Sequence, residues 1–311
     1  MDKMQGRRKE SNAGRTSPGA YLAATLAVGL WGGSFVATKV ALCELSPPTL
    51  VWLRFAMGMA ILGAALLARR CLALPTLKET GYFALLGFLG ITLHQWLQSN
   101  GLVTSQAATT AWIVATTPVF IALLGWLALK ERLGLLQVLG IGLAAIGVLL
   151  VVSRGDWAAF GAGGFGAPGD RLILLSAPNW ALFSVLSRPG LDRRPAGWMM
   201  FYVLALGWLF STVLFLAGPG LGEVAGLSRR GWLALLFLGI FCSGLAYLAW
   251  YGALQAIPAS QAGAFLYLEP LVTTGAAAAL LGEALTPSTL LGGAIILLGV
   301  WLVQAKSLIV Q

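Results

Sequence analysis

Charged side chains are scarce in this chain, which is 10% charged and 58% hydrophobic, with a mean hydropathy of +0.84. A soluble domain carries about 25% charged residues, so this composition excludes one. Histidine occurs once, and the three cysteines form neither a disulfide framework nor a CxxC pair. The chain also lacks aspartate inside its apolar segments, an HExxH pattern and a phosphate loop. We therefore expect no metal, no cofactor and no enzymatic activity.

Long apolar segments take the place of the missing charges. A helix that crosses a hydrocarbon core of about 30 Å needs roughly 20 apolar residues, and such segments recur along almost the whole chain. We expect an all-α integral membrane protein with ten transmembrane helices. The expected spans are about 19–42, 48–69, 80–102, 105–128, 134–152, 171–188, 197–218, 230–254, 258–281 and 287–305.

The distribution of Lys and Arg predicts the orientation. With the basic segment 1–17 inside, the inner segments hold 14 of the 20 basic residues and the outer segments hold four. The positive-inside rule then places both termini, a disordered tail at 1–17 and a tail at 306–311, in the cytoplasm. The formal charge of +9 is thereby explained by topology and anionic lipid, so we expect no nucleic-acid partner. The expected location is the inner (cytoplasmic) cell membrane.

One block of the sequence occurs twice. Residues 118–151 align with 270–303 without a gap after a shift of 152 positions. The matched prolines, glutamates and glycines are hard to attribute to a Leu- and Ala-rich composition, although chance similarity is the alternative. The pairs are Pro118 and Pro270, Glu131 and Glu283, Gly140 and Gly292, and Gly147 and Gly299. We interpret them as a duplication, in which the two prolines have a structural or gating role.

The duplication predicts two five-helix halves. We expect them at 18–152 and 171–305, joined by a glycine-rich linker at 153–170. Because five crossings are an odd number, the second half is inverted relative to the first. Inverted repeats with a binding site near the midplane are the architecture of many secondary transporters, in which one half rocks against the other.

Several short motifs accompany the repeated block. They are Trp31-Gly32-Gly33-Ser34-Phe35, Lys39, Pro48, Arg54-Phe55, Asn179-Trp180 with Arg188, and Leu268-Glu269-Pro270. Together with the repeat, they resemble the EamA-type transporters of the drug/metabolite transporter superfamily, over roughly 20–303. The resemblance implies ten helices in two inverted repeats around a central cavity lined by helices 1, 3, 4, 6, 8 and 9. It also implies export of small metabolites, commonly amino acids, by alternating access.

Two titratable residues are candidates for the transport chemistry. Glu269 lies about midway along the ninth span, beside Pro270, whose missing N–H frees a backbone carbonyl. Ionisable groups inside a membrane are costly and usually functional, so we expect Glu269 to bind a proton or a substrate ammonium. A carboxyl satisfied by neighbouring helices is the alternative. His94 shares a helical face with Gln98 and is either the other proton carrier, lining the cavity, or a packing histidine.

Three basic residues are expected to have structural or gating roles. Lys39 lies near the outer end of the first span, from which its ammonium can extend to the interface. Arg54 lies about two turns inside the second span, with Glu44 as a candidate partner. Arg188 is placed pseudo-symmetrically to Lys39, near the inner end of the sixth span.

Aromatic residues inside the spans are either core packing or a cavity lining. Ser243, Tyr247 and Tyr251 repeat at intervals of four and so share one face of the eighth span. A cavity with apolar rings and few polar anchors suits amphipathic or aromatic solutes, which favours amino acids over sugars. The expected substrate-binding residues are Trp31, Ser34, His94, Gln98, Trp112, Trp180, Tyr247, Tyr251 and Glu269.

The repeated glycines and glutamates are expected to serve structure. Glycines spaced by seven let the fifth and tenth helices approach a neighbour closely, either between the repeats or between two copies in a homodimer. Glu131 and Glu283 lie near the start of those same helices, where a carboxylate stabilises the helix dipole.

The favoured function is secondary active export of small metabolites, with aromatic or hydrophobic amino acids preferred. The alternatives on the same fold are a lipid flippase and a nucleotide-sugar carrier, although few basic residues in the cavity helices are available to bind a diphosphate. An alternative of another class, an intramembrane enzyme, lacks the necessary motifs.

Overall fold

The computed structural model describes residues 18–71, 73–129, 133–156, 166–254, 256–257 and 264–309, and all regular elements within these ranges are helices. The expected tail at 1–17, residues 310–311 of the expected tail at 306–311, much of the expected linker and Glu131 lie outside the described residues. Residues 306–309 continue α16. In chain order the elements are α2 (Pro18–Ala41), α3 (Pro47–Ala68), α4 (Leu77–Gly87), η1 (Phe88–Leu93), α5 (His94–Thr104), α6 (Ala107–Val114), α7 (Thr117–Leu129), α8 (Leu135–Ser153), α10 (Pro168–Arg193), α11 (Ala196–Leu216), η2 (Gly220–Gly226), α12 (Arg229–Leu236), η3 (Phe237–Leu245), α13 (Ala246–Leu254), α15 (Leu268–Leu281) and α16 (Pro287–Ile309).

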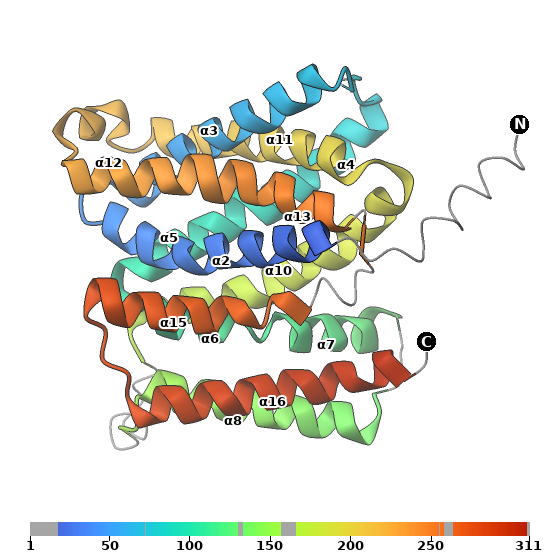
Figure 1. Cartoon of the computed structure of the whole chain (residues 1–311), viewed down its shortest axis with the longest axis vertical. Helices are drawn as coiled ribbons and strands as arrows, with labels where there is room; N and C mark the ends of the chain where they lie inside the picture. Colours follow the sequence, from blue (N-terminus) through green and yellow to red (C-terminus); the bar gives the residue numbers. More distant parts are fainter. Residues whose placement is uncertain are drawn as a thin grey trace, which may run out of the picture.

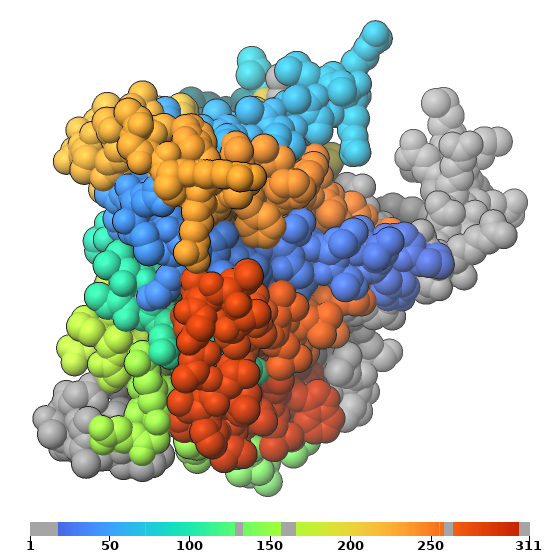
Figure 2. Space-filling model, turned by 60° about the vertical axis from the view of Figure 1, so that its left-hand side comes forward, coloured from blue at the N-terminus to red at the C-terminus, as the bar shows by residue number. Residues whose placement is uncertain are grey.

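The helices run roughly parallel to one another in stacked rows (Figure 1). Seven helical stretches in the described part are long and apolar enough to cross a membrane. Leucines on the outer faces of terminal helices are exposed, including Leu22 and Leu26 of α2 and Leu291 and Leu298 of α16. Figure 2 shows these N-terminal (blue) and C-terminal (red) segments on one face of the molecule. Such a surface is suited to lipid, because water-exposed apolar patches of this extent are rare in soluble monomers.

Two long helices contain a π-helical stretch at matching places in the two halves. The first is η1, between α4 and α5, and the second is η3, between α12 and α13. A π turn leaves backbone groups without their usual helical partners and often marks a functional site. In each case a side chain from another helix binds a carbonyl of the stretch. Asn179 Nδ2 donates to Leu89 O at 2.8 Å, and Trp31 Nε1 donates to Cys242 O at 3.2 Å.

Two further helices are interrupted just before the repeated prolines. The chain turns at Ala115 and Thr116 between α6 and α7, and at Leu266 and Tyr267 before α15. Pro118 and Pro270 lie in the first turn of the segments that follow. Proline lacks an N–H and clashes with the carbonyl four residues earlier, so each helix ends and a new one begins there.

The repeated glycines bring α8 and α16 into direct backbone contact. A Cβ atom on Gly140 would lie 2.5 Å from Gly299 O, and one on Gly147 would lie 2.7 Å from Gly292 O. The beginning of each helix therefore packs against the end of the other, so the two are antiparallel, as Figure 1 shows at the lower edge. These glycines are used within one chain, so they do not by themselves indicate a homodimer.

Glu283 caps a different helix from the one expected. Its Oε1 accepts from the N–H of Ala107 at 2.8 Å and its Oε2 from that of Ala108 at 3.1 Å, which places it at the start of α6 and not of α16. The expectation for α16 is therefore wrong. The chain reverses after α15, and this turn brings the carboxylate to the unsatisfied N–H groups of the neighbouring helix.

This contact makes a prediction for stability. Replacement of Glu283 by alanine leaves two N–H groups of α6 without their acceptor and should lower the stability by about 1 kcal/mol, as the loss of a cap does. The melting temperature of the purified chain in detergent would measure this. Replacement of Asp192, which is exposed at the end of α10, is the control. An equal effect of the two changes would contradict the capping role.

Candidate functional site

Four of the predicted aromatic residues pack in or around one hydrophobic core. Tyr247 is 9% exposed, and Trp31, Trp180 and Tyr251 pack around the same core, half-buried. The ring of Trp31 stands edge-on to that of Tyr247, with centroids 5.6 Å apart, and lies 5.4 Å from that of Trp250. We call Trp31, Trp180, Tyr247 and Tyr251 the aromatic cluster.

A buried guanidinium lies beside this cluster. Arg54 is 7% exposed, and its Nε donates to Ser243 Oγ at 3.1 Å and its Nη1 to Gln95 Oε1 at 3.4 Å. Glu44 was the expected partner, and this expectation is wrong. Glu44 lies in the turn after α2 and accepts from the hydroxyl and the backbone N–H of Ser228 at 2.6 and 2.7 Å. These hydrogen bonds lower the pKa of Glu44, and the bond from the Ser228 hydroxyl contributes more than the bond from its N–H group.

His94 lies at the other edge of the aromatic cluster. It is 5% exposed, and its ring is 4.6 Å from that of Trp180. Its Nδ1 is fully enclosed and has no hydrogen-bond partner in the described structure. Gln98, one turn further along α5, is half-buried. The two residues predicted to share a helical face therefore differ in exposure: the ring of His94 is enclosed, and the amide of Gln98 is more accessible.

Glu269 lies in the first turn of α15, directly after the interruption of the helix. It is half-buried, and within the described ranges its carboxylate has no ion pair or hydrogen bond. The backbone of this turn packs tightly on α2, since a Cβ atom on Gly32 would lie 2.9 Å from Glu269 O. Thr273 Oγ1 also donates to Gly32 O at 2.8 Å. A carboxylate is favoured at this position because it faces the positive end of a helix dipole.

Two of the predicted site residues are not available at this centre as expected. Trp112 lies apart from it, and the hydroxyl of Ser34 is bonded within its own helix. Trp112 is 2% exposed and belongs to a separate core with residues of α8 and α16, where its ring packs against Gly293. Ser34 donates its hydroxyl proton to Trp31 O at 2.6 Å, one turn earlier in α2. The structure thus brings Trp31, His94, Trp180, Tyr247 and Tyr251 together, but not Trp112.

The ammonium of Lys39, which was expected to extend to the interface, lies against the end of α5. Its Nζ donates to Leu102 O at 3.2 Å and to Ser105 O, at the end of α5. A cation at this place satisfies free carbonyls and the negative end of the helix dipole. The hydroxyl of Ser105 in turn donates to Asp170, a carboxylate with 0% exposure at the start of α10.

Asp170 was not singled out from the sequence, because it stands at the end of a glycine-rich stretch. The available signal was its place two residues after Pro168, since an acidic residue in the first turn is typical of a helix start. Its Oδ2 accepts from the N–H of Ala167 at 2.8 Å. Asp170 therefore both caps α10 and joins it to the end of α5.

Arg188 does not mirror Lys39. It is exposed near the end of α10. The contacts at this end are made by neighbouring residues: Arg194 Nε donates to Glu79 Oε1 at 2.6 Å, and Trp198 Nε1 and the hydroxyl of Tyr202 donate to Ala73 O. The first contact joins the end of α10 to α4, and the other two join α11 to the loop before α4.

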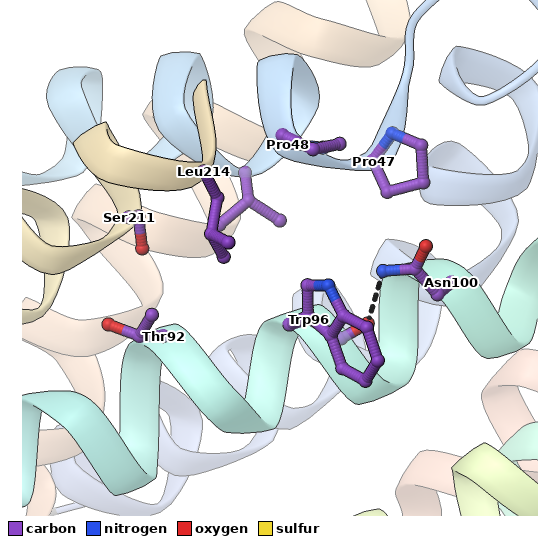
Figure 3. A pocket seen from close by; sticks show the side chains of 8 residues that line it. Pro47, Pro48, Thr92, Trp96, Asn100, Ser211 and Leu214 are labelled. Atoms are coloured by element: carbon purple, nitrogen blue, oxygen red, sulfur yellow. Dashed lines mark hydrogen bonds between the residues drawn. The ribbon is translucent and has the colours of Figure 1, made fainter. Parts of the chain in front are cut away.

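Two surface hollows are lined by residues other than those of the aromatic cluster. One, between α3, α5 and α11, has a volume of about 10 Å³ and is lined by Pro47, Thr92, Trp96, Asn100 and Ser211 among others (Figure 3). This is room for about one water. The other is an open groove of about 480 Å³ beside α3 and α11, lined mainly by apolar side chains such as Leu74, Leu206 and Leu209.

Comparison with known proteins identifies the family. The model of the EamA-like transporter family matches residues 18–153 and 167–305. An uncharacterized transporter of Archaeoglobus fulgidus is 31% identical over 92% of this chain and 97% of its own length, and the uncharacterized transporter YdfC of Bacillus subtilis is 31% identical over 91% and 90%. A protein of Streptantibioticus cattleyicolor named a probable terminal-alkyne amino-acid exporter is 27% identical over 93% and 94%.

A solved crystal structure has a similar fold, with a TM-score of 0.64 and 22% identity, covering 94% of this chain and 100% of the other. The family and these relatives are transporters and not enzymes. The described part is all-helical, with seven candidate membrane spans. The protein is a multi-pass membrane transporter and belongs to the EamA-like transporter family.

Proposed function

We propose that this transporter is a secondary active exporter of small metabolites, with aromatic or hydrophobic amino acids as the favoured substrates. The observation that carries the proposal is Glu269, a carboxylate without a partner in the described structure, on the helix that packs against Gly32, next to Trp31 of the aromatic cluster. A substrate ammonium can bind such a carboxylate, and rings can contact an apolar side chain. The name of the S. cattleyicolor relative supports this substrate class.

Alternating access requires that the two halves of the transporter adopt two relative arrangements. Inverted repeats allow this, and we propose that the chain forms ten transmembrane helices in two inverted five-helix repeats. The antiparallel packing of α8 and α16 supports this, because these helices carry the two copies of the repeated glycines. The π stretches and helix interruptions at matching places support it too. In this arrangement both termini are cytoplasmic, and Lys39, Arg54, Arg188, Pro118 and Pro270 hold or gate the helices.

The proposed binding residues are Glu269 and the aromatic cluster, with His94, Gln98 and Ser34. Trp112 is not among them, because it packs in a separate core with α8 and α16. Glu269 is the proposed proton-coupling group, and His94 is the alternative. A homodimer is a separate hypothesis, which light scattering of the purified chain would test.

The test is counterflow in liposomes that contain the full chain. Vesicles loaded with an unlabelled amino acid should accumulate labelled L-phenylalanine several-fold above empty liposomes, because exchange is faster than net transport. Aliphatic amino acids should compete, and sugars and polyamines should not. If no amino acid competes, the proposed substrate class is wrong.

The apolar groove beside α3 and α11 is the observation that favours the alternative, a lipid flippase. A headgroup cannot cross apolar surface without polar partners, whereas acyl chains can lie in such a groove. Transfer of fluorescent phospholipid between the leaflets of the same vesicles distinguishes the two functions. Nucleotide sugars also belong in the panel of competitors, because a nucleotide-sugar carrier is the other alternative on the same fold.

A further inference from the structure

Arg54 carries a positive charge that the protein does not neutralise in the described structure. The described ion pair of the chain is that of Arg194 and Glu79, at the surface. Within the described ranges, the titratable groups that interact electrostatically with Arg54 are Cys242, Tyr247 and His94, and none of these three is a carboxylate. A cation held inside a membrane protein without a counter-ion is costly and is usually retained for a function.

The guanidinium also has hydrogen-bond donors to spare. Of its five N–H groups, one is used by Ser243 and one by Gln95, the latter at the long distance of 3.4 Å. The fully enclosed atoms without a partner in the described part are His94 Nδ1, Thr109 Oγ1 and Trp112 Nε1. Nη2 of Arg54 is not among them, although it makes no hydrogen bond. Its N–H groups therefore still reach accessible space.

The two unpaired charges both lie close to Trp31. The indole of Trp31 donates to Cys242 O, and the adjacent Ser243 binds Arg54. Gly32, the next residue of α2, packs against the backbone of Glu269. A cation and an anion therefore lie near the aromatic cluster, and the described residues show no ion pair between them. This arrangement fits a molecule with an anionic group, an apolar body and a cationic group.

We propose that Arg54 is the residue that recognises the carboxylate of the transported solute, so that the substrates are carboxylate-bearing and not simple amines, sugars or polyamines. The planar guanidinium can present two parallel N–H groups to a carboxylate. Ser243 orients the guanidinium, and Gln95 yields its weak hydrogen bond when the carboxylate arrives. This inference rests on the proposed export function and names its substrate class.

A purely structural role is the competing explanation, since Arg54 also ties α3 to η3 and α5. The two roles differ in what they do to selectivity. Loss of a structural tie weakens transport of every substrate alike. Loss of a carboxylate site weakens only those substrates that have a carboxylate.

The experiment compares ligands that differ in one group. In counterflow of labelled L-phenylalanine by the full chain in liposomes, unlabelled L-phenylalanine should compete at least tenfold more strongly than L-phenylalaninamide, which lacks the carboxylate. Arg54→Gln should abolish this preference, and Arg54→Lys should keep part of it. Arg229→Gln, which removes an exposed cation at the start of α12, should keep all of it. Equal competition by acid and amide in the unmodified protein would overturn the proposal, as would an unchanged preference in Arg54→Gln.

Two further measurements keep the result decisive. If Arg54→Gln does not fold, Ser243→Ala should reduce the preference for the acid, and an unchanged preference would count against the proposal. If no amino acid is exchanged, the proposed substrate class has failed, and binding then decides about Arg54. The melting temperature of the purified chain should rise with 3-phenylpropionate and not with 3-phenylpropionamide, and this rise should be smaller, but not absent, in Arg54→Lys. Equal effects of the two compounds, or none, would overturn the carboxylate site.

Discussion

Replacement of Glu269 by glutamine is expected to weaken amino-acid transport by about 10- to 150-fold. The change removes the charge but keeps the shape of the side chain. A hydrogen bond to a charged group contributes about 1.5–3 kcal/mol, and 1.4 kcal/mol corresponds to a factor of ten in binding. Glu269 has no partner in the described structure that would absorb the loss. The apparent affinity in counterflow measures the effect directly.

The same variant tests proton coupling. If Glu269 carries the proton, counterflow by the unmodified chain depends on pH, and the glutamine variant loses this dependence. Asp192→Asn removes one carboxylate at an exposed position of α10 and should leave both affinity and pH profile intact. A glutamine variant with full transport and an unchanged pH profile would rule out Glu269, and His94→Asn would then test the alternative carrier.

The all-helical membrane fold could be predicted from composition, because about 20 apolar residues per crossing leave few other arrangements. The repeated glycines likewise predicted close helix contact, and the structure identifies the partner as α16 for α8. The local irregularities could not be predicted in this way. A π stretch such as η3 has the same apolar composition as an α-helix, and its carbonyl partner, Trp31, is 211 residues away.

The candidate site was only partly predictable for a similar reason. Sequence spacing placed Tyr247 and Tyr251 on one face, and they do lie together in the structure. Spacing within one helix does not say which other helix it faces. Trp112 was grouped with the aromatic cluster, but its side of α6 faces α16. Polar partners depend on tertiary contacts, so Arg54 was paired with Glu44, which is near in sequence, and not with Ser243, which is near in space.

Replacement of Gly147 by leucine is expected to destabilise the fold more than the other stability changes considered. A Cβ atom there would lie 2.7 Å from Gly292 O and 2.9 Å from Ile296 N. Both are backbone atoms of α16, so no side chain can turn aside to make room. The helices must separate, which forfeits the contacts along their length. Overpacking of a well-packed site costs about 1–3 kcal/mol, and a clash with backbone belongs at the upper end of that range.

Gly142 provides the matched control, because it is exposed on the same helix and a Cβ atom there would meet nothing within 4 Å. Gly142→Leu should keep or raise the melting temperature, since leucine favours a helix more than glycine does. Gly147→Leu should lower the melting temperature of the chain in detergent and the yield of folded protein. Gly292→Leu should act in the same way from the opposite helix, because its Cβ would lie 2.8 Å from Gly147 O. If Gly142→Leu and Gly147→Leu behaved alike, α8 and α16 would not be in close contact in the membrane. The antiparallel contact that supports the inverted repeats would then be lost.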